Sequence, residues 1–230
     1  PDEPVSSDIL PVNLPIDIVY EDEDLIILNK ATGMPVHPSQ GHHENTLANA
    51  LAYRFASRGE HFVFRAVNRL DRDTTGLLLI AKHKISGAFL SAMTAKKEIR
   101  REYLAIVAGK PEESGTIDLP IARKDGSTIE RCIDMDHGEH AVTHYRCLDY
   151  RDDLGCSLLR LRLETGRTHQ IRVHMKAIGH PLLGDFLYNP DYRFIGRQAL
   201  HSYTVAFRHP ITGEAMEFSA PMPEDFSFFY

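Results

Sequence analysis

The chain is 230 residues long with 43% hydrophobic residues, which is enough for one domain with a substantial core, and its formal net charge is -6. Uninterrupted apolar runs such as residues 77–81 are far shorter than the roughly 20 residues that a helix needs to cross a bilayer, which argues against a membrane protein. The N-terminus has acids and prolines where a signal peptide has a basic and then an apolar region, and we expect a cytoplasmic protein.

The predicted elements begin after an extended segment. Residues 1–15 contain four prolines and little periodicity, so we expect an acidic, proline-rich linker there. Residues 16–230 are then expected to form one domain. Its first elements are two strands, residues 16–20 and 25–28, joined through an acidic turn, because short apolar runs bounded by polar residues favour strands.

The next part of the chain predicts alternating helices and strands. Asn45 is expected to cap a helix whose apolar face consists of Leu47, Leu51 and Phe55. Residues 77–81 are continuous Leu, Ile and Ala, as expected of a strand that is covered on both faces. A short helix over residues 86–97 and a strand over residues 103–107 follow.

The stretch from residue 116 to residue 146 is polar and charged, with a turn signal at Asp125-Gly126. This pattern predicts a hairpin that protrudes from the body. Such a hairpin could contact a nucleic acid, or could be an exposed loop with no role in binding.

The remaining elements complete the predicted fold. Thr168 is expected to cap a helix over residues 169–178 that ends at Gly179. Three more strands are expected over residues 156–163, 200–207 and 215–218. Strands outnumber helices and several follow one another closely, so we predict an α+β fold with a mixed, largely antiparallel sheet flanked by helices.

A charged segment precedes the predicted central strand. Residues 67–76 read Val-Asn-Arg-Leu-Asp-Arg-Asp-Thr-Thr-Gly, which places the carboxylates of Asp71 and Asp73 beside the guanidiniums of Arg69 and Arg72. Positive neighbours keep Asp71 ionised even where water is removed, and an ionised carboxylate can attack without a base. By itself, however, such a segment more often forms a structural ion pair.

Five further stretches of sequence change this balance. Residues 163–174 read Leu-Glu-Thr-Gly-Arg-Thr-His-Gln-Ile-Arg-Val-His, and residues 178–185 read Ile-Gly-His-Pro-Leu-Leu-Gly-Asp. Residues 18–30 end in Ile-Leu-Asn-Lys, residues 33–38 read Gly-Met-Pro-Val-His-Pro, and residues 101–105 read Arg-Glu-Tyr-Leu-Ala. With these strings, residues 17–220 strongly resemble the RluA-type RNA pseudouridine synthases.

The resemblance implies the pseudouridine synthase fold and an isomerase that converts uridine in ribosomal or transfer RNA to pseudouridine. Carried over by position, it implies Asp71 as the catalytic aspartate, Tyr103 as the active-site aromatic residue and Arg172 as the basic residue that pairs with the aspartate. Arg69 would lie beside the flipped nucleotide. The reaction has no redox step and adds no external group, so we expect no cofactor.

Two positions differ from the pattern that the family usually shows. Asn68 stands where the family usually has His, and Ala31 stands where it usually has Pro. We therefore expect the loop beside Asp71 to hold its RNA differently. The expected RNA-binding residues are Arg69, Arg72, Lys30, Arg167 and Lys82.

The distribution of charge agrees with an RNA partner. Residues 1–24 hold eight acids and residues 209–230 hold four, and neither segment has a Lys or Arg. The rest of the chain therefore has 26 basic residues against 20 acids, which is a charge of +6. A single basic cluster is usually a solvated face, but three clusters, at residues 65–72, 96–101 and 160–176, flank motif segments and predict a groove for a phosphate backbone.

No pattern in the sequence indicates a metal or a disulfide. Cys132, Cys147 and Cys156 lack Cys-x-x-Cys spacing, so we expect reduced thiols. There are 13 histidines, but His169 and His174 are five residues apart, and the chain has no His-Glu-x-x-His string. We expect loop and packing roles for them.

Three hypotheses stay open at this point. The first is an RNA uridine isomerase, the second a non-catalytic RNA-binding relative, and the third a hydrolase of N-glycosidic bonds that uses Asp71 and Asp73. We expect a monomer. Because the chain begins with Pro and many relatives carry a small RNA-binding domain of the S4 type before such a linker, we also expect it to be the catalytic part of a longer protein.

Overall fold

The computed structural model describes residues 9–39 and 41–230, so most of the predicted linker, residues 1–8, lies outside the described residues. The chain divides into two compact units. Unit 1 comprises residues up to Arg100 together with Thr204–Ala220, and unit 2 comprises Arg101–Tyr203 and Pro221–Tyr230. We describe each unit by itself.

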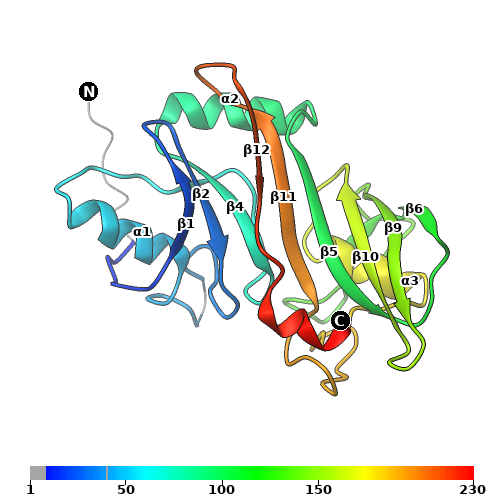
Figure 1. The fold of residues 1–230 in the computed structure, drawn as a ribbon. Helices are drawn as coiled ribbons and strands as arrows, with labels where there is room; N and C mark the ends of the chain where they lie inside the picture. The colour runs from blue at the N-terminus through cyan, green and yellow to red at the C-terminus, as the bar shows by residue number, and fades with distance from the viewer. Residues whose placement is uncertain (1–8, 40) are drawn as a thin grey trace. The chain divides into compact units, whose positions relative to one another are not determined.

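Unit 1 is built on antiparallel strands (Figure 1). Its strands are β1 (Asp17–Glu21), β2 (Leu25–Lys30), β3 (Arg65–Ala66), β4 (Thr75–Ala81), the last part of β11 (Leu200–Arg208) and β12 (Ala215–Ser219). The strand order is β1-β2-β4-β11, with β12 paired to β11 and β3 paired to β4. The pairs β1–β2, β2–β4, β3–β4 and β11–β12 are all antiparallel.

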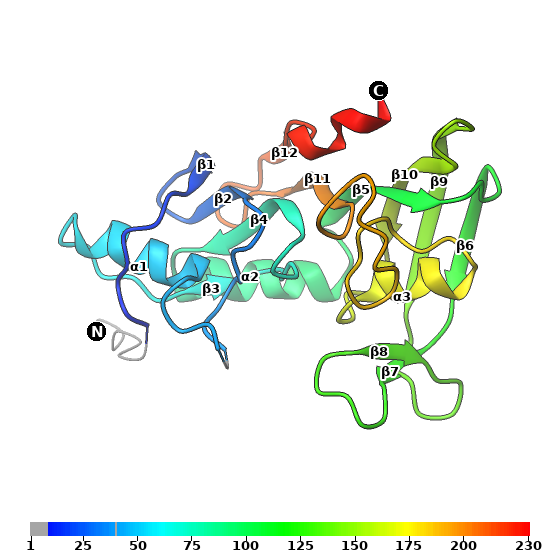
Figure 2. The same ribbon diagram turned by 90° about the horizontal axis from the view of Figure 1, so that it is seen from below.

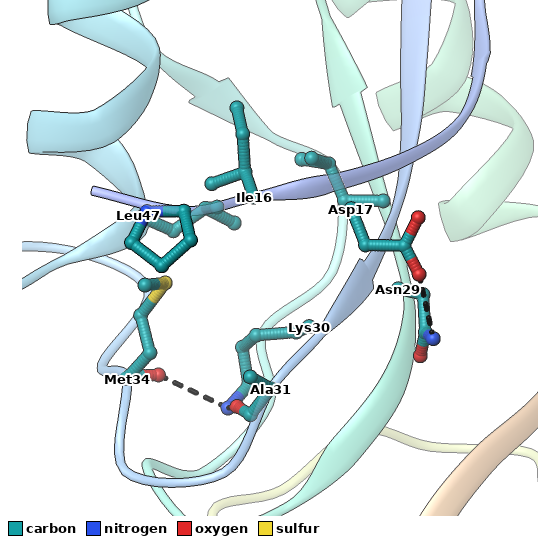
Figure 3. A pocket seen from close by; sticks show the side chains of 9 residues that line it. Ile16, Asp17, Asn29, Lys30, Ala31, Met34 and Leu47 are labelled. Carbon is teal, nitrogen blue, oxygen red and sulfur yellow. Dashed lines mark hydrogen bonds between the residues drawn. The ribbon is translucent and has the colours of Figure 1, made fainter. Parts of the chain in front are cut away.

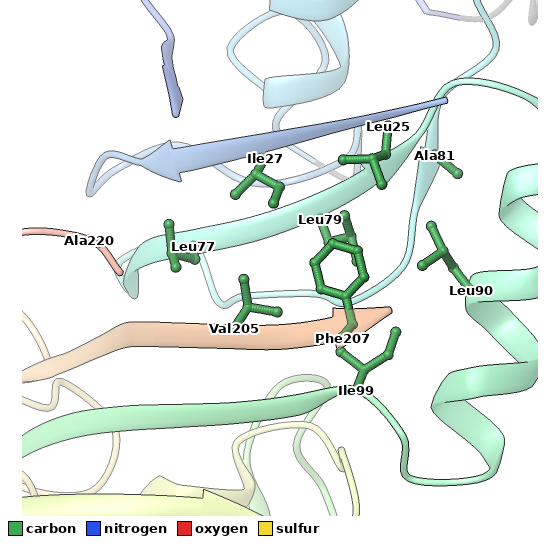
Figure 4. Packing of buried hydrophobic residues seen from close by; sticks show 10 residues of the cluster. All are labelled: Leu25, Ile27, Leu77, Leu79, Ala81, Leu90, Ile99, Val205, Phe207 and Ala220. Carbon is green, nitrogen blue, oxygen red and sulfur yellow. The ribbon is translucent and has the colours of Figure 1, made fainter. Parts of the chain in front are cut away.

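The core of unit 1 forms around β2 and β4. Every residue of β4 is buried, as the continuous apolar run predicts. Successive side chains of a strand point to opposite faces, so a wholly buried strand must be covered on both sides. On one face the side chains pack into the cluster drawn in Figure 4, which contains Leu25, Ile27, Leu77, Leu79, Ala81, Leu90, Ile99, Val205, Phe207 and Ala220.

Two helices complete unit 1, and their starts correct the sequence predictions. Helix α1 (Leu47–Ala56) is capped by Thr46 and not by Asn45, because the Thr46 side chain accepts from the backbone N–H of Asn49. Helix α2 (Lys84–Ala95) begins two residues earlier than predicted, where the Ser86 hydroxyl accepts from the N–H of His83.

Residues 9–15 form no helix or strand, as expected of an extended segment. They are nevertheless held against α1. The N–H of Val12 donates to the carbonyl of Asn49, and the Asn49 side chain donates to the carbonyl of Leu10. Ile9 is buried.

Unit 2 has its own antiparallel strands. They are β5 (Arg100–Ala108), β6 (Ser114–Asp118), β7 (Ile121–Arg123), β8 (Arg131–Ile133), β9 (Val142–Arg151) and β10 (Cys156–Leu163). The order β5-β10-β9-β6 is antiparallel throughout, and β7 pairs only with β8 among the named strands of the described chain. Helix α3 (Gln170–Ala177) and the 3-10 helix η1 (Glu224–Phe229) are the helical elements of this unit. The predicted α+β class with a largely antiparallel sheet flanked by helices is confirmed.

The prediction of one protruding hairpin over residues 116–146 is partly wrong. Only the β7–β8 hairpin stands apart from the main strands of unit 2 (Figure 2), and Gly126 at φ +73° forms part of its turn. The flanking residues belong to β6 and β9, where Thr116 is opposite His144. The sequence did not predict these strands because most of their residues are polar and at least partly exposed. Thr143 of β9 is polar yet fully buried, and its hydroxyl is satisfied by the side chains of Gln170 and His174.

Helix α3 starts one residue later than predicted. Its N-cap is His169 and not Thr168, and His169 has the left-handed backbone conformation (φ 58°) that non-glycine residues seldom adopt. The His169 ring is held by a contact of 2.9 Å between Nδ1 and the Tyr188 hydroxyl. Gly179, at φ +84°, follows the end of the helix as predicted.

Cys132 and Cys147 are partly exposed and Cys156 is buried, and all three are free cysteines. Among residues 9–39 and 41–230, no helix combines the length and the apolar character needed to span a membrane.

A buried histidine of unit 2 predicts how the stability of the fold depends on pH. Burial, reinforced by the Arg197 guanidinium, lowers the pKa of His201 to about 4. The unfolded chain takes up a proton on His201 near pH 6.5, while the folded chain does so only near the lower value, so stability is lost as the pH falls between the two. We expect His201 to lower the free energy of unfolding by about 2 kcal/mol when the pH falls from 7 to 5. Urea unfolding of wild type and His201→Gln at both pH values measures this, since other titrating groups are common to both proteins, and equal losses in the two proteins would contradict it.

Candidate active site

Asp71 lies in the loop between β3 and β4 of unit 1. The side chain is half-buried, and the neighbouring Arg69 is exposed. The backbone N–H of Thr74 donates to the carbonyl of Asp71 at 3.1 Å, which closes a turn just before β4 begins. The loop is therefore fixed at one end to a strand that is buried along its whole length.

Arg72 and Asp73 form an ion pair on this loop. Arg72 donates from Nε to both carboxylate oxygens at 3.1 Å and from Nη2 to Oδ2 at 2.7 Å. The Asp73 carboxylate raises the pKa of Arg72 above its ordinary value. Asp73 therefore has a structural partner in Arg72.

Asn68 begins the same loop. Its Oδ1 accepts the backbone N–H of Leu79 in β4 at 3.0 Å, and the residue is buried. Within the described part of the chain, Nδ2 of Asn68 has no acceptor within hydrogen-bond distance. A buried donor without a partner costs about 1 to 3 kcal/mol.

Lys30, expected to bind RNA, is almost completely buried at the end of β2. Its ammonium donates to the carbonyls of Ala31 at 2.8 Å, Met34 at 3.0 Å and Arg72 at 2.8 Å. The last contact ties the Asp71 loop to the segment that follows β2. Lys30 therefore has a structural role, and its contact with phosphate stays a prediction.

A pocket of about 270 Å³ lies beside Lys30 (Figure 3). Its walls are mainly apolar, and Asp17 and Asn29, which share a hydrogen bond of 3.0 Å, lie at one side. The lining residues are Pro15, Ile16, Asp17, Leu28, Asn29, Lys30, Ala31, Met34 and Leu47. Asp71 is not among them, so this pocket is distinct from the surface that carries the carboxylate.

Lys82 is also held by the protein. Its ammonium donates to the carbonyl of Asp22 at 2.5 Å, lies 3.5 Å from Glu21 Oε1 and is 5.5 Å from the centre of the Phe55 ring. The side chain is 14% exposed. These contacts join β1, α1 and the end of β4, and an RNA contact of Lys82 stays a prediction.

Near Lys82, one set of side chains in the described residues has donor atoms close enough together to hold a metal ion, namely Asp22, Asp24 and His209. These atoms already have protein partners. His209 Nδ1 accepts from the N–H groups of Ile211 and Thr212, and Nε2 lies 3.0 Å from the Asp22 carboxylate. The set ties the hairpin between β11 and β12 to the turn between β1 and β2.

Tyr103 and Arg172 belong to unit 2. Tyr103 lies on β5, is 5% exposed and stands opposite Leu161 of β10. Arg172 lies on α3 and is 1% exposed. Both are held by regular secondary structure, which favours a fixed side-chain geometry.

Arg172 has a carboxylate partner that the sequence did not single out. Its Nε donates to Asp185 Oδ2 at 2.7 Å and its Nη2 donates to Oδ1 at 2.8 Å. Asp185 is fully buried and also accepts from the backbone N–H groups of Leu187 and Tyr188. The sequence signal for this pair was an acid directly after the apolar string Leu182-Leu183-Gly184. An acid in such a position is expected to be buried, and a buried carboxylate needs a cationic partner.

Aromatic rings enclose the same guanidinium. The Arg172 Cζ atom is 5.0 Å from the centre of the Tyr188 ring and 5.5 Å from that of Phe186. Burial raises the pKa of Tyr188 to about 12, so the phenol is neutral at physiological pH. The pair of Arg172 and Asp185 is thus a rigid feature of unit 2.

Arg167 lies in the loop before α3 and is exposed. Its Nη1 donates to the Glu139 carboxylate, and its Nε donates to the carbonyl of His140 at 3.1 Å. These contacts attach the loop to the segment after the β7–β8 hairpin. A phosphate contact for Arg167 stays a prediction.

The expected site residues are therefore divided between the units. Asp71, Arg69, Arg72, Lys30 and Lys82 belong to unit 1, and Tyr103, Arg167 and Arg172 belong to unit 2. Within unit 1, Lys30 meets the carbonyl of Arg72 in the Asp71 loop. The pairing of Asp71 with Arg172 and Tyr103 stays a prediction from the sequence.

Comparison with known families decides the class of the protein. A family model described as RNA pseudouridylate synthase matches residues 24–177, which is more than half of the chain and includes Asp71, Tyr103 and Arg172. The chain belongs to the RNA pseudouridylate synthase family. Members of this family are isomerases that convert uridine in RNA to pseudouridine, so the family resemblance predicted from the motifs is confirmed.

Individual relatives agree with this assignment. The uncharacterized RNA pseudouridine synthase YjbO of Bacillus subtilis (strain 168) is 43% identical over 228 residues, covering 99% of this chain and 80% of the relative. Ribosomal large subunit pseudouridine synthase D of Zymomonas mobilis is 43% identical, covering 96% of this chain and 73% of the relative. The solved structure of human RNA Pseudouridylate Synthase Domain Containing 1 matches with a TM-score of 0.74 at 27% identity, covering 96% of this chain and 86% of the human one.

The buried ion pair of this pseudouridine synthase predicts a large effect on stability. Asp185→Ala leaves the Arg172 guanidinium buried without its carboxylate, and we expect unfolding free energy to fall by about 3 to 5 kcal/mol. Urea unfolding measures the change. Asp191→Ala is the matched control, because Asp191 pairs at 2.6 Å with an Arg193 that is 72% exposed, and the expected loss there is below about 1 kcal/mol. Similar losses for both variants would contradict the prediction.

Proposed function

We propose that this synthase isomerises uridine in ribosomal RNA and that the Asp71 carboxylate is the catalytic group. The observation that carries the proposal is the Arg-Leu-Asp string at residues 69–71, which places a half-buried acid on a loop fixed to buried β4. The relative named for the large ribosomal subunit supports ribosomal rather than transfer RNA. We also propose a monomer that acts in the cytoplasm.

The proposed reaction needs only what a carboxylate supplies. The bond from N1 to C1′ breaks, the base rotates, and C5 bonds to C1′ while the C5 proton leaves and N1 gains one. Asp71 attacks C1′ or C6, or takes a proton from C2′ while the glycosidic bond opens. Each route begins with an ionised carboxylate.

The uridine must leave the RNA stack before Asp71 can reach it, at a cost of a few kcal/mol. We propose that the Tyr103 ring stacks on the extruded base, which offsets about 1 to 3 kcal/mol of that cost. Arg172 would steady the charge of Asp71, and Arg69 would fill the space that the base vacates.

We assign contacts with the RNA phosphate backbone to those basic side chains that are exposed to solvent. Arg69, Arg72 and Arg167 are exposed and are proposed to contact phosphates directly. Lys30 and Lys82 hold protein carbonyls, so we propose that they contribute mainly positive charge around the Asp71 loop.

The test is to incubate the purified protein with ribosomal and transfer RNA and to assay pseudouridine, free uracil and bound RNA. We expect pseudouridine in ribosomal RNA that disappears with Asp71→Asn, because the amide is not an anionic nucleophile or base. Free uracil would indicate a hydrolase, binding without product would indicate a non-catalytic relative, and product only in transfer RNA would change the proposed substrate.

We also propose that the Tyr103 hydroxyl helps to move the C5 proton, and two variants separate this role from stacking. Tyr103→Phe keeps the stacking ring but removes the hydroxyl proposed to move the C5 proton, so we expect turnover to fall about 100-fold with unchanged RNA affinity. Tyr103→Leu also removes the ring and is expected to weaken RNA binding by about 1 to 3 kcal/mol. Single-turnover rates and filter-binding measurements check both, and full turnover by Tyr103→Phe would rule out the proton role.

A further inference from the structure

The strand pairing that leads into the Asp71 loop ends in an unusual way. Strands β3 and β4 are antiparallel, with Arg65 opposite Ala81 and Ala66 opposite Ile80. The next rung places Val67 opposite Leu79, and the Val67 N–H donates to the Leu79 carbonyl at 2.9 Å.

In a regular hydrogen-bonded pair of two antiparallel strands, each residue donates its N–H to the carbonyl of the residue opposite. Here the Leu79 N–H donates to the side-chain oxygen of Asn68 at 3.0 Å. The amide oxygen thus takes the place of the Val67 carbonyl, which would accept this N–H in a regular pair. The main chain is free to turn away from β4 at Asn68, three residues before Asp71.

The other side of the loop is held by separate contacts. Thr74 closes the turn onto the Asp71 carbonyl, and Lys30 holds the carbonyl of Arg72. Asn68 is the side chain that fixes the loop on the side where it leaves β3. The position of Asp71 is therefore set between two points that are anchored to β2 and β4.

The Nδ2 atom of the Asn68 side chain bears on the role of this residue. Its Nδ2 is buried and meets no acceptor in the described part of the chain, which lowers stability. A residue that served stability alone would pair both ends of the amide. An unsatisfied buried polar group calls for an explanation, and at Asn68 the place of the residue beside the Asp71 loop supplies one.

We propose that Asn68 is a positioning residue for Asp71, because its Oδ1 caps the last rung of β3–β4 and so sets where the loop leaves the sheet. The inference rests on the proposed function, in which Asp71 is the catalytic group. It also assigns a role to the position where the family usually has His, since the Nδ1 of a neutral imidazole is as many bonds from the backbone as Oδ1 and can accept the same N–H.

The test compares Asn68→Leu, which has a similar shape but no acceptor, with Asn68→His. For Asn68→Leu we expect the single-turnover rate constant to fall about 10-fold to 100-fold, because a small displacement of a reacting group has effects of this size. The dissociation constant for RNA should stay within about twofold of wild type, because no proposed phosphate contact is removed. Asn68→His should recover most of the rate. If Asn68→Leu does not fold, Asn68→Ala gives the same comparison with a smaller side chain.

Hydrogen exchange of the Leu79 amide, followed by NMR, tests the geometry without any activity. The amide should exchange faster in Asn68→Leu and be protected again in Asn68→His. The matched control is Asn49→Leu, which removes a buried asparagine of unit 1 that bonds Thr46 and Leu10 instead. This control is expected to lose stability but to keep the wild-type rate constant for its folded fraction.

The outcomes separate the two proposals. A wild-type rate constant in folded Asn68→Leu, or a rate loss in Asn49→Leu as large as in Asn68→Leu, overturns the role of Asn68 while leaving Asp71 as the catalytic group. Unchanged protection of the Leu79 amide in Asn68→Leu also overturns it. If wild type forms no pseudouridine, or if Asp71→Asn retains full activity, the proposed function fails instead.

Discussion

The hydrogen-bonded pairing of β4 with its neighbours is the constraint on which the Asp71 loop depends. All seven residues of β4 are buried, and Ile27 of β2 is opposite Leu79. A shift of one residue in this register would exchange the two faces of the strand, so that each buried side chain would meet the packing of the opposite face. The start of β4 is therefore fixed by burial along the whole strand. The end of the loop that carries the Asp71 carboxylate is fixed with it.

Local patterns in the sequence predicted the elements whose burial is continuous or strictly periodic. The run at residues 77–81 predicted β4 because nothing polar interrupts it, and the alternation at residues 156–163 predicted β10. The starts of α1 and α3 were each misplaced by one residue. At α1 two adjacent residues, Asn45 and Thr46, are able to cap with a side chain. At α3 the N-cap His169 makes no side-chain cap and is held instead by its contact with Tyr188, 19 positions away.

Contacts distant in sequence explain what was missed in the candidate site. Arg172 was singled out from its motif, but its bidentate partner Asp185 depends on how the chain returns to α3 after 13 residues. Likewise, the basic residues predicted to bind RNA look alike in the sequence. The structure separates them, because Lys30 and Lys82 are held by backbone carbonyls whereas Arg69 is exposed. Charge alone does not distinguish a side chain that stabilises a loop from one that reaches solvent.

The division of the chain between the units has a consequence for biosynthesis. Unit 1 takes most of its residues from the beginning of the chain, yet its core includes Val205, Phe207 and Ala220. A nascent polypeptide that has not yet been extended through residue 220 lacks three members of that cluster. Folding of unit 1 therefore has to wait until residue 220 has been synthesised, and a premature stop codon after residue 200 would compromise a unit whose residues up to Arg100 had already been made.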